Sequence, residues 1–298
     1  MFTLTHSNMS TFRDCPFKFK ASYIDGLRPV VIKDSLKIGT AFHLFRESGP
    51  EAVEKYFSQF FPSTQEEADK LETQKAIVKG LTSLAPDEPA VTREVEWLNP
   101  LINPATGAPS KTFNLGGKAD GLLALTNGTF ALIEEKTTGS SPGRSDIDKL
   151  SIDNQVMNCI VNLAESHGAK VSEVYYRYYR KPSIRQRQGE TVEQYSQRLL
   201  EDYEGRPEFY YHEERLIFPQ PQLEGFRTDL WQVGKAILWF RRYDLWYRNT
   251  SHCIDWGGCP YLPLCRGENV DGLYKVGTPN PELTKEESHE QFVAGIEV

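Results

Sequence analysis

Four of the five cysteines in this chain of 298 residues lie close to its two ends. Cys15 is near the N-terminus, whereas Cys253, Cys259 and Cys265 follow one another in a loop rich in Gly and Pro. The chain begins without a charged stretch that leads an apolar run, so we expect no signal peptide and a cytoplasmic protein. Disulfides are rare in that compartment. The cysteines therefore predict a fold whose first and last segments are held together by another kind of thiol site.

The spacing of the three C-terminal cysteines bears on what they could bind. Five residues separate Cys253 from Cys259, and five separate Cys259 from Cys265. Structural zinc sites favour cysteine pairs only two residues apart, so zinc is an alternative rather than the first expectation. Unrelated buried thiols would not account for the regular spacing.

Hydrophobic periodicity indicates one α/β domain, a short mixed sheet flanked by helices. Hydrophobic residues make up 39% of the chain, enough for a substantial core. No stretch approaches the roughly 20 apolar residues of a membrane-spanning helix. We expect the domain to cover residues 1–270 and a polar, flexible tail to cover 271–298. The predicted helices are 7–23, 36–47, 64–84, 152–166, 191–204 and 222–248, and the predicted strands are 91–97, 113–125, 129–136, 173–180 and 208–218.

Charged residues end one of the apolar strands. Glu134 and Lys136 follow the apolar run 130–133. Because residues two apart in a strand share a face, these two point together and Glu135 points away. Charges at the end of a buried strand are unfavourable unless they bind something. The alternative is an ordinary surface ion pair.

Asp120 is the expected partner of this pair. A turn at 126–128 joins its strand to that of Glu134 in a hairpin. A three-residue loop would place Asp120 opposite Glu134, whereas a two-residue turn at 127–128 would place it opposite Glu135 and require a bulge. Both registers are compatible with the sequence. Two carboxylates at one point suit Mg²⁺ or Mn²⁺, and a lysine beside them could position an attacking water.

The order of these residues resembles the RecB-like branch of the PD-(D/E)XK nuclease superfamily. The matching positions are Gly39 to His43, Asp120, Glu134, Lys136 and Gln155. By itself, His43 in an apolar helix is more typical of a core histidine than of a ligand.

The resemblance implies a restriction-endonuclease-like core with specific roles for these residues. His43, Asp120 and Glu134 would ligate Mg²⁺ or Mn²⁺. Asp120, Glu134 and Lys136 would be catalytic, with Gln155 supporting them from the next helix. Glu94 matches an acidic position common on the preceding strand. Cys159 stands where the family often has tyrosine, which leaves the role of that position open.

The cysteines are similar to those of iron–sulfur nucleases in the same superfamily, such as the AddB nuclease domain, the CRISPR adaptation nucleases and exonuclease V. There, one cysteine before the nuclease core and three after it hold a [4Fe–4S] cluster. The resemblance implies that this cluster joins the N- and C-terminal segments here and that Cys159 is not a ligand. The middle cysteine spacing is longer than the usual two residues. The implied ligands are Cys15, Cys253, Cys259 and Cys265.

The resemblances imply a Mg²⁺- or Mn²⁺-dependent deoxyribonuclease, an exonuclease acting on single-stranded ends in recombination, repair or replication. Its partners would be DNA that is single-stranded or has free ends, and a helicase or recombination protein. We expect no association with a membrane. The net charge of −7 argues against binding DNA by bulk attraction, but the basic and aromatic segment 175–187 could follow a single strand. The alternative is a catalytically silent iron–sulfur module that binds DNA or a helicase. No nucleotide or flavin fingerprint supports a redox enzyme.

Overall fold

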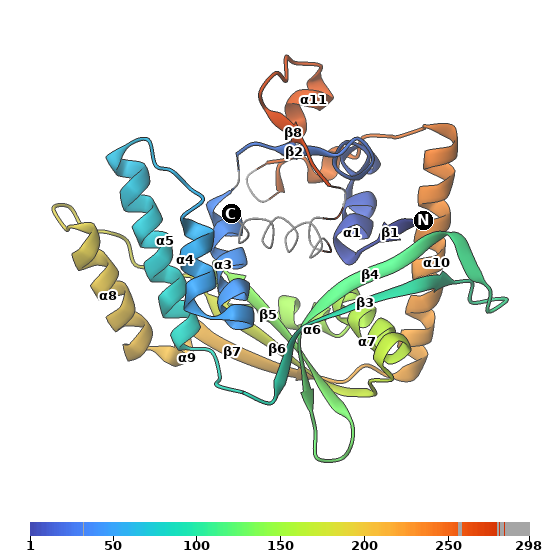
Figure 1. The fold of residues 1–298 in the computed structure, drawn as a ribbon, viewed down its shortest axis with the longest axis horizontal. Coiled ribbons are helices and arrows are strands. Elements are labelled where there is room, and N and C mark those ends of the chain that lie inside the picture. Colours follow the sequence, from blue (N-terminus) through green and yellow to red (C-terminus); the bar gives the residue numbers. More distant parts are fainter. Residues whose placement is uncertain (32, 256–257, 279, 281–282, 284–298) are drawn as a thin grey trace, which may run out of the picture.

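A mixed sheet forms the centre of the molecule in the computed structural model, with helices on both sides of it (Figure 1). The structure describes residues 1–31, 33–255, 258–278, 280 and 283. Strand β4 pairs antiparallel with β3 and β5 and parallel with β1, while β6 pairs parallel with β5 and antiparallel with β7. This confirms the predicted α/β class with a mixed sheet. The strands are β1 (Phe2–Leu4), β3 (Val91–Ile102), β4 (Pro109–Ala124), β5 (Phe130–Thr138), β6 (Val171–Arg180) and β7 (Tyr211–Leu216).

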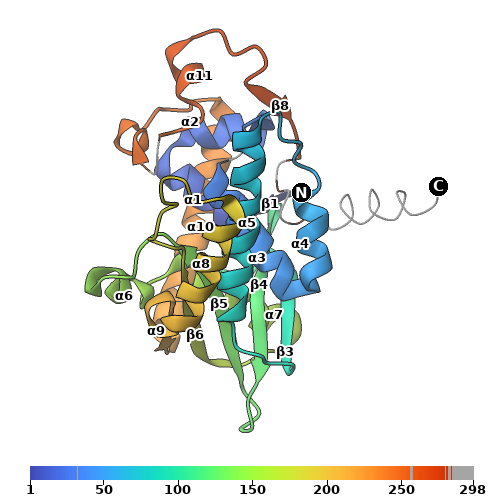
Figure 2. The ribbon, with the colours of Figure 1, turned by 90° about the vertical axis from the view of Figure 1, so that its left-hand side faces the viewer.

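Two hydrophobic cores cover the two faces of the sheet. Leu132 and Tyr176 belong to the core beneath α7 (Asn154–His167) and α10 (Gln220–Tyr243). Tyr179, on the other face of β6, belongs to a second core. The helices of that second core gather together in Figures 1 and 2. They are α3 (Asp34–Ser48), α4 (Pro50–Phe57), α5 (Gln65–Ser83), α8 (Val192–Gly205) and the short α9 (Pro207–Tyr210).

The predicted helix over 7–23 is broken at Cys15. The first part, α1 (His6–Asp14), is capped by the Thr5 hydroxyl, which accepts from the Asn8 amide at 3.2 Å. Cys15 is extended because a residue before proline avoids the helical region, and Pro16 then starts the next helix at a position that suits it. The second part consists of α2 (Pro16–Phe19) and a π-helix (Lys20–Ile24). Cys15 therefore lies in a break between helices and not inside one.

Several elements differ from those that the sequence predicted. Part of the predicted strand 208–218 is the helix α9, with β7 following it. Residues 274–276, expected in the tail, form β8 (Tyr274–Val276), which pairs with β2 (Leu27–Pro29). Most of the predicted tail lies outside the described residues. Within the described part of the chain, no helix has the length and apolar character to cross a bilayer. The remaining short helices are α6 (Arg144–Leu150), a 3-10 helix (Thr250–His252) and α11 (Leu262–Arg266).

Candidate metal and catalytic site

The hairpin of β4 and β5 has the register of the three-residue loop. The last ladder pair before the site is Gly121 with Ile133, and residues 126–128 form the loop at the other end. Asp120 and Glu134 come next on the two strands and are therefore opposite each other. This decides between the two registers that the sequence allowed, and no bulge is needed.

Strand β3 adds a third carboxylate to this row of the sheet. Glu94 lies between the pairs that join Arg93 to Gly121 and Val95 to Ala119, so it is opposite Asp120. Its φ is 53°, in the left-handed region that residues other than glycine rarely adopt. Burial raises the pKa of Glu94, which is only 7% exposed, and its ion pair with Lys118 opposes that shift.

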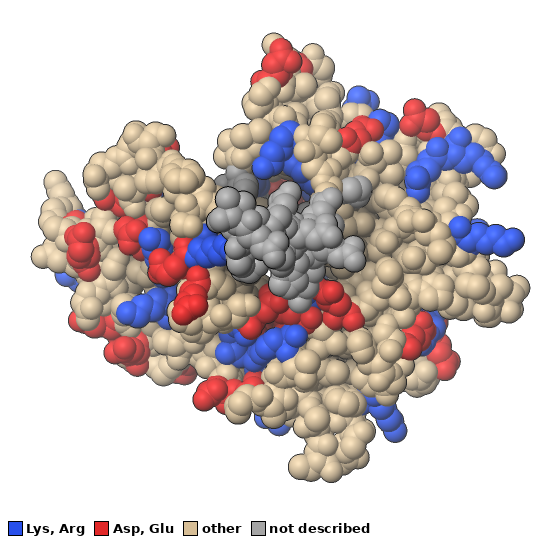
Figure 3. Space-filling model, in the orientation of Figure 1, with Lys and Arg blue, Asp and Glu red and all other residues tan. Residues whose placement is uncertain are grey.

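His43 approaches the same row from α3. Its Nδ1 lies 3.5 Å from Asp120 Oδ1, and the ligand atoms of His43, Glu94 and Asp120 all lie within 4.8 Å of one another. One imidazole nitrogen and two carboxylates suit a small divalent cation. The predicted proximity of His43 and Asp120 is therefore present, and Glu94, the weaker match in sequence, completes the group. Acidic side chains also gather near the middle of the face in Figure 3, around the place where α3 approaches the sheet.

Glu134 and Lys136 form an ion pair beside this group, as their positions predicted. Lys136 Nζ also donates to Gln155 Oε1 of α7 at 3.1 Å. Burial raises the pKa of Glu134, and the ammonium of Lys136 opposes that shift. Burial also opposes the charge on Lys136, but the carboxylates of Glu134 and Asp120 outweigh it and raise its pKa. The structure thus brings together the predicted carboxylate, lysine and glutamine.

One oxygen of Glu134 supports a cation site at this point. Among the described residues, Oε2 of Glu134 is buried without a hydrogen-bond partner. A buried carboxylate oxygen left in this way is unfavourable unless a cation or water satisfies it. A divalent cation nearby would also favour the charged form of Glu134, against the effect of burial. The side chains present therefore fit the metal that the sequence predicted.

Glu135 contributes to the site in a way that the sequence did not indicate. Its side chain points to the opposite face, as predicted, while its backbone amide donates to Asp120 Oδ2 at 2.8 Å. Its side chain is fully buried and surrounded by cationic side chains. The only sequence signal is a charge at an inward position of an apolar strand.

The segment 175–187 is only partly available to DNA. Arg177 is 1% exposed and forms a bidentate ion pair with Glu88, with both distances 2.7 Å, and Tyr179 is fully buried. Strand alternation places these residues in the second core, so the expectation that they contact a nucleic acid is wrong. Tyr178 and Arg180 lie on the other face and are half-buried, with Tyr178 paired in register with Lys136.

The N- and C-terminal cysteine segments lie together. The amide of Asn249 donates to Cys15 Sγ at 3.4 Å, and the amide of Phe17 donates to the Tyr247 carbonyl at 3.1 Å. Burial raises the pKa of the Cys265 thiol, Arg248 opposes this shift, and the nearby thiols of Cys259 and Cys15 act in the same direction as burial. The segment of Cys15 therefore lies beside the segment that leads into the C-terminal cysteines, as a site shared by both would require.

All five cysteines are free thiols. The amide of Cys259 donates to the Cys253 carbonyl at 2.8 Å, so these two lie in one tight loop. Cys159 differs from the other four because it is buried in the core on α7, where burial raises its pKa. Cys159 thus differs in its surroundings from the four cysteines that the sequence predicts as cluster ligands.

Glu94 provides a test of whether the site carries strain. We expect Glu94→Gly to leave the free energy of unfolding without metal unchanged or to raise it by about 1 kcal/mol, because glycine adopts a positive φ without strain. The same change should weaken Mn²⁺ binding. Denaturant unfolding and Mn²⁺ titration would measure the two effects.

The matched control is Glu96→Gly, on the same strand but without a positive φ. Glycine in an ordinary strand position destabilises, here by about 0.5–1 kcal/mol. If both variants lose the same stability, the backbone at Glu94 stores no strain. If Glu94→Gly binds Mn²⁺ as the wild type does, Glu94 is not a ligand.

Comparisons with known proteins show the family of this chain. The family model described as PD-(D/E)XK nuclease superfamily matches residues 3–266. A proposed exonuclease from Eubacterium rectale has a similar fold, with 11% identity, a TM-score of 0.54, and 95% of this chain and 93% of that chain covered. An alkaline exonuclease from Laribacter hongkongensis is 13% identical, with a TM-score of 0.25 and with 68% of this chain and 91% of that chain covered. No curated protein matches this chain.

Proposed function

The chain belongs to the PD-(D/E)XK nuclease superfamily, and from this we infer that it is a Mg²⁺- or Mn²⁺-dependent deoxyribonuclease of the RecB-like branch. The observation that carries the proposal is the row of carboxylates Glu94, Asp120 and Glu134, flanked by His43 and Lys136. Such a group combines cation ligands with a fixed positive charge. Both are what hydrolysis of a phosphodiester bond requires.

Each residue of the site has a distinct task in the proposed reaction. His43, Glu94 and Asp120 would hold the cation, with Glu134 offering its unpaired oxygen. A bound cation would act as a Lewis acid and lower the pKa of an attacking water. Lys136 keeps its positive charge beside these carboxylates and can stabilise charge on the scissile phosphate.

Gln155 and Glu135 support the reacting groups. Gln155 accepts a hydrogen bond from Lys136 and so limits where the ammonium can move. The amide of Glu135 holds one oxygen of Asp120 and leaves the other facing His43. The site is therefore largely organised by protein contacts, which reduces the rearrangement needed on binding.

We propose that the substrate is DNA with single-stranded ends, degraded in recombination, repair or replication together with a helicase or recombination partner. Tyr178, half-buried beside Lys136, supports this because an unpaired base could stack on its ring. Arg180 lies on the same face, and its Cζ is 4.1 Å from the centroid of the Phe209 ring. With a net charge of −7, these local groups are better suited to hold a strand than bulk attraction is.

We also propose that Cys15, Cys253, Cys259 and Cys265 hold a [4Fe–4S] cluster that joins the two ends of a single domain. Support comes from the free thiols of both segments in one neighbourhood and from the separate position of Cys159. Thiolates are the usual ligands of such clusters. Free thiols also suit the cytoplasm, where we place the protein.

A nuclease assay tests the proposed activity. We expect purified protein to degrade labelled linear single-stranded DNA with Mg²⁺ or Mn²⁺, and EDTA to stop the reaction because it removes the cation that would activate the attacking water. Linear double-stranded DNA and covalently closed circular single strands serve as comparison substrates. An exonuclease would leave the circles intact.

Each outcome of this assay has a definite meaning. Cleavage of the circles at the rate of the linear strand would contradict the exonuclease assignment while keeping the nuclease. Binding of DNA without cleavage by either metal would favour the catalytically silent module. Cleavage that persists in EDTA would overturn the metal-dependent mechanism.

A further inference from the structure

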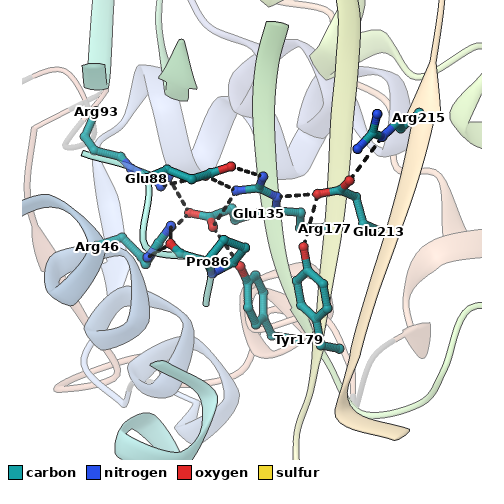
Figure 4. A network of polar contacts seen from close by, with 10 residues as sticks. Arg46, Pro86, Glu88, Arg93, Glu135, Arg177, Tyr179, Glu213 and Arg215 are labelled. Atoms are coloured by element: carbon teal, nitrogen blue, oxygen red, sulfur yellow. Dashed lines mark hydrogen bonds and ion pairs between the residues drawn. The ribbon is translucent and has the colours of Figure 1, made fainter. Parts of the chain in front are cut away.

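We propose that Glu135 is a positioning residue that ties together the elements that carry the metal-site side chains, an inference that rests on the proposed nuclease function. Its carboxylate is 0% exposed and lies in a network of mostly buried polar groups (Figure 4). Because neighbouring residues of a strand point to opposite faces, this network and the Glu134 side chain lie on different faces of the sheet. The network contacts α3 and β3, the elements that carry the proposed ligands His43 and Glu94. Its members, besides Glu135, are Arg46, Glu88, Arg93, Arg177, Tyr179, Glu213 and Arg215.

Both oxygens of Glu135 are engaged. Oε2 accepts from Arg93 Nη1 at 2.9 Å and from Arg46 Nε at 3.3 Å. Oε1 accepts from the Tyr179 hydroxyl at 2.9 Å, and Arg177 Nη1 lies 4.0 Å away. Hydrogen bonds to ionised groups are stronger than neutral ones, so these contacts fix the side chain firmly.

The partners of Glu135 are next to the proposed ligands in sequence. Arg46 follows His43 by three residues on α3, which places both on neighbouring parts of one helix face. Arg93 directly precedes Glu94 on β3. The Glu135 carboxylate therefore joins α3, β3 and β5, on the face of the sheet opposite the Glu134 side chain.

A further connection, from Glu135 to Asp120 on β4, runs through the backbone. The Glu135 amide donates to Asp120 Oδ2 at 2.8 Å, while Oδ1 lies 3.5 Å from His43 Nδ1. If the Glu135 side chain moved, its amide would turn and the Asp120 carboxylate would lose its orientation. The partner of a metal ligand acts in this way on the ligand's geometry and basicity.

The strained backbone of Glu94 gives a second reason for the assignment. A residue with a positive φ persists only where its surroundings hold it in place. The ion pair between Arg93 and Glu135 reaches across β4 from the residue directly before Glu94. We infer that this pair helps to keep Glu94 directed at the cation site.

The chemistry of the network points to positioning rather than to stability alone. Buried ion pairs often stabilise a fold no better than apolar residues of the same volume, because removing charges from water is unfavourable. Here three carboxylates meet three largely buried guanidinium groups; the carboxylates are Glu88, Glu135 and Glu213, and the guanidinium groups are Arg46, Arg93 and Arg177. Directional contacts of this kind fix backbone positions that apolar packing would leave less defined.

The test compares Glu135→Gln with Glu213→Gln by measuring affinity for Mn²⁺ alone. Each variant removes one carboxylate charge from the network, but within the described part of the chain the polar contacts of Glu213 are with Arg177, Tyr211 and Arg215, which lie outside the ligand-bearing segments. We expect Glu135→Gln to weaken Mn²⁺ binding about 10- to 100-fold, the usual effect of losing a partner of metal ligands. Glu213→Gln should bind Mn²⁺ as the wild type does. Thermal unfolding without metal reports the stability of both variants.

The outcomes separate this inference from the proposed function. Wild-type protein that binds no Mn²⁺ would refute the metal site itself. Wild-type affinity in folded Glu135→Gln, or equal losses of affinity in both variants, would refute the positioning role. If Glu135→Gln does not fold, Arg46→Gln decides, since it removes the connection from Glu135 to α3 together with the hydrogen bonds from Arg46 to the Pro86 carbonyl. Unchanged Mn²⁺ affinity in Arg46→Gln would then overturn the inference.

Discussion

Lys136→Met is expected to abolish metal-dependent DNA cleavage while the protein stays folded and still binds Mn²⁺. Methionine keeps most of the length of the side chain but removes the charge that Glu134 and Gln155 hold in place. Removing one group that stabilises transition-state charge commonly lowers kcat by about 100- to 1000-fold. Single-turnover cleavage of a labelled linear strand would measure the loss.

The control for this variant is Lys75→Met. Lys75 pairs with Glu72 on the same helix, α5, away from the carboxylate row, and surface pairs of this kind contribute little. This control should cleave DNA at the wild-type rate. Full activity in Lys136→Met would refute the assignment of the catalytic lysine, and loss of Mn²⁺ binding would indicate a disturbed site rather than a missing charge.

Cys15→Ala is expected to produce the largest loss of stability. If the four grouped thiols hold a cluster, they close a loop that spans most of the chain, and a cross-link of that size removes roughly 5 kcal/mol of chain entropy from the unfolded state. For a domain of this length the melting temperature should fall by about 10 °C or more, and soluble yield should fall with it. Thermal unfolding of anaerobically purified protein would measure the change.

Metal content gives the companion measurement. Wild-type protein should be brown with about four irons per chain if the cluster is [4Fe–4S], and Cys15→Ala should lose iron. Cys159→Ala, which changes the core thiol on α7, should keep both iron and colour. Colourless protein with bound zinc would refute the [4Fe–4S] cluster and indicate a zinc site. A Cys15→Ala protein as stable as wild type but inactive on DNA would refute the structural role.

Local periodicity in the sequence determined most of the secondary structure and the faces on which the site residues of β5 lie. Alternation along β5 places Glu134 and Lys136 on one face, and the turn at 126–128 brings Asp120 to them. The alternation and the hairpin depend on residues near one another in the chain, so the sequence was sufficient to predict them. It left two registers open for the hairpin, and the structure decided that Asp120 is opposite Glu134. The α/β class and most helices and strands follow from the same periodicity.

Only the tertiary structure decided what surrounds that pair of strands. Glu94 joins the ligand group because β3 pairs with β4 in one register and takes a positive φ there. Arg177, basic and beside aromatic residues in sequence, is buried against Glu88, so it is not a contact for DNA. Periodicity assigns a side chain to a face but does not identify the groups that pack on that face. Those groups come from distant segments, and for Glu135 they turn an isolated buried charge into the centre of a network.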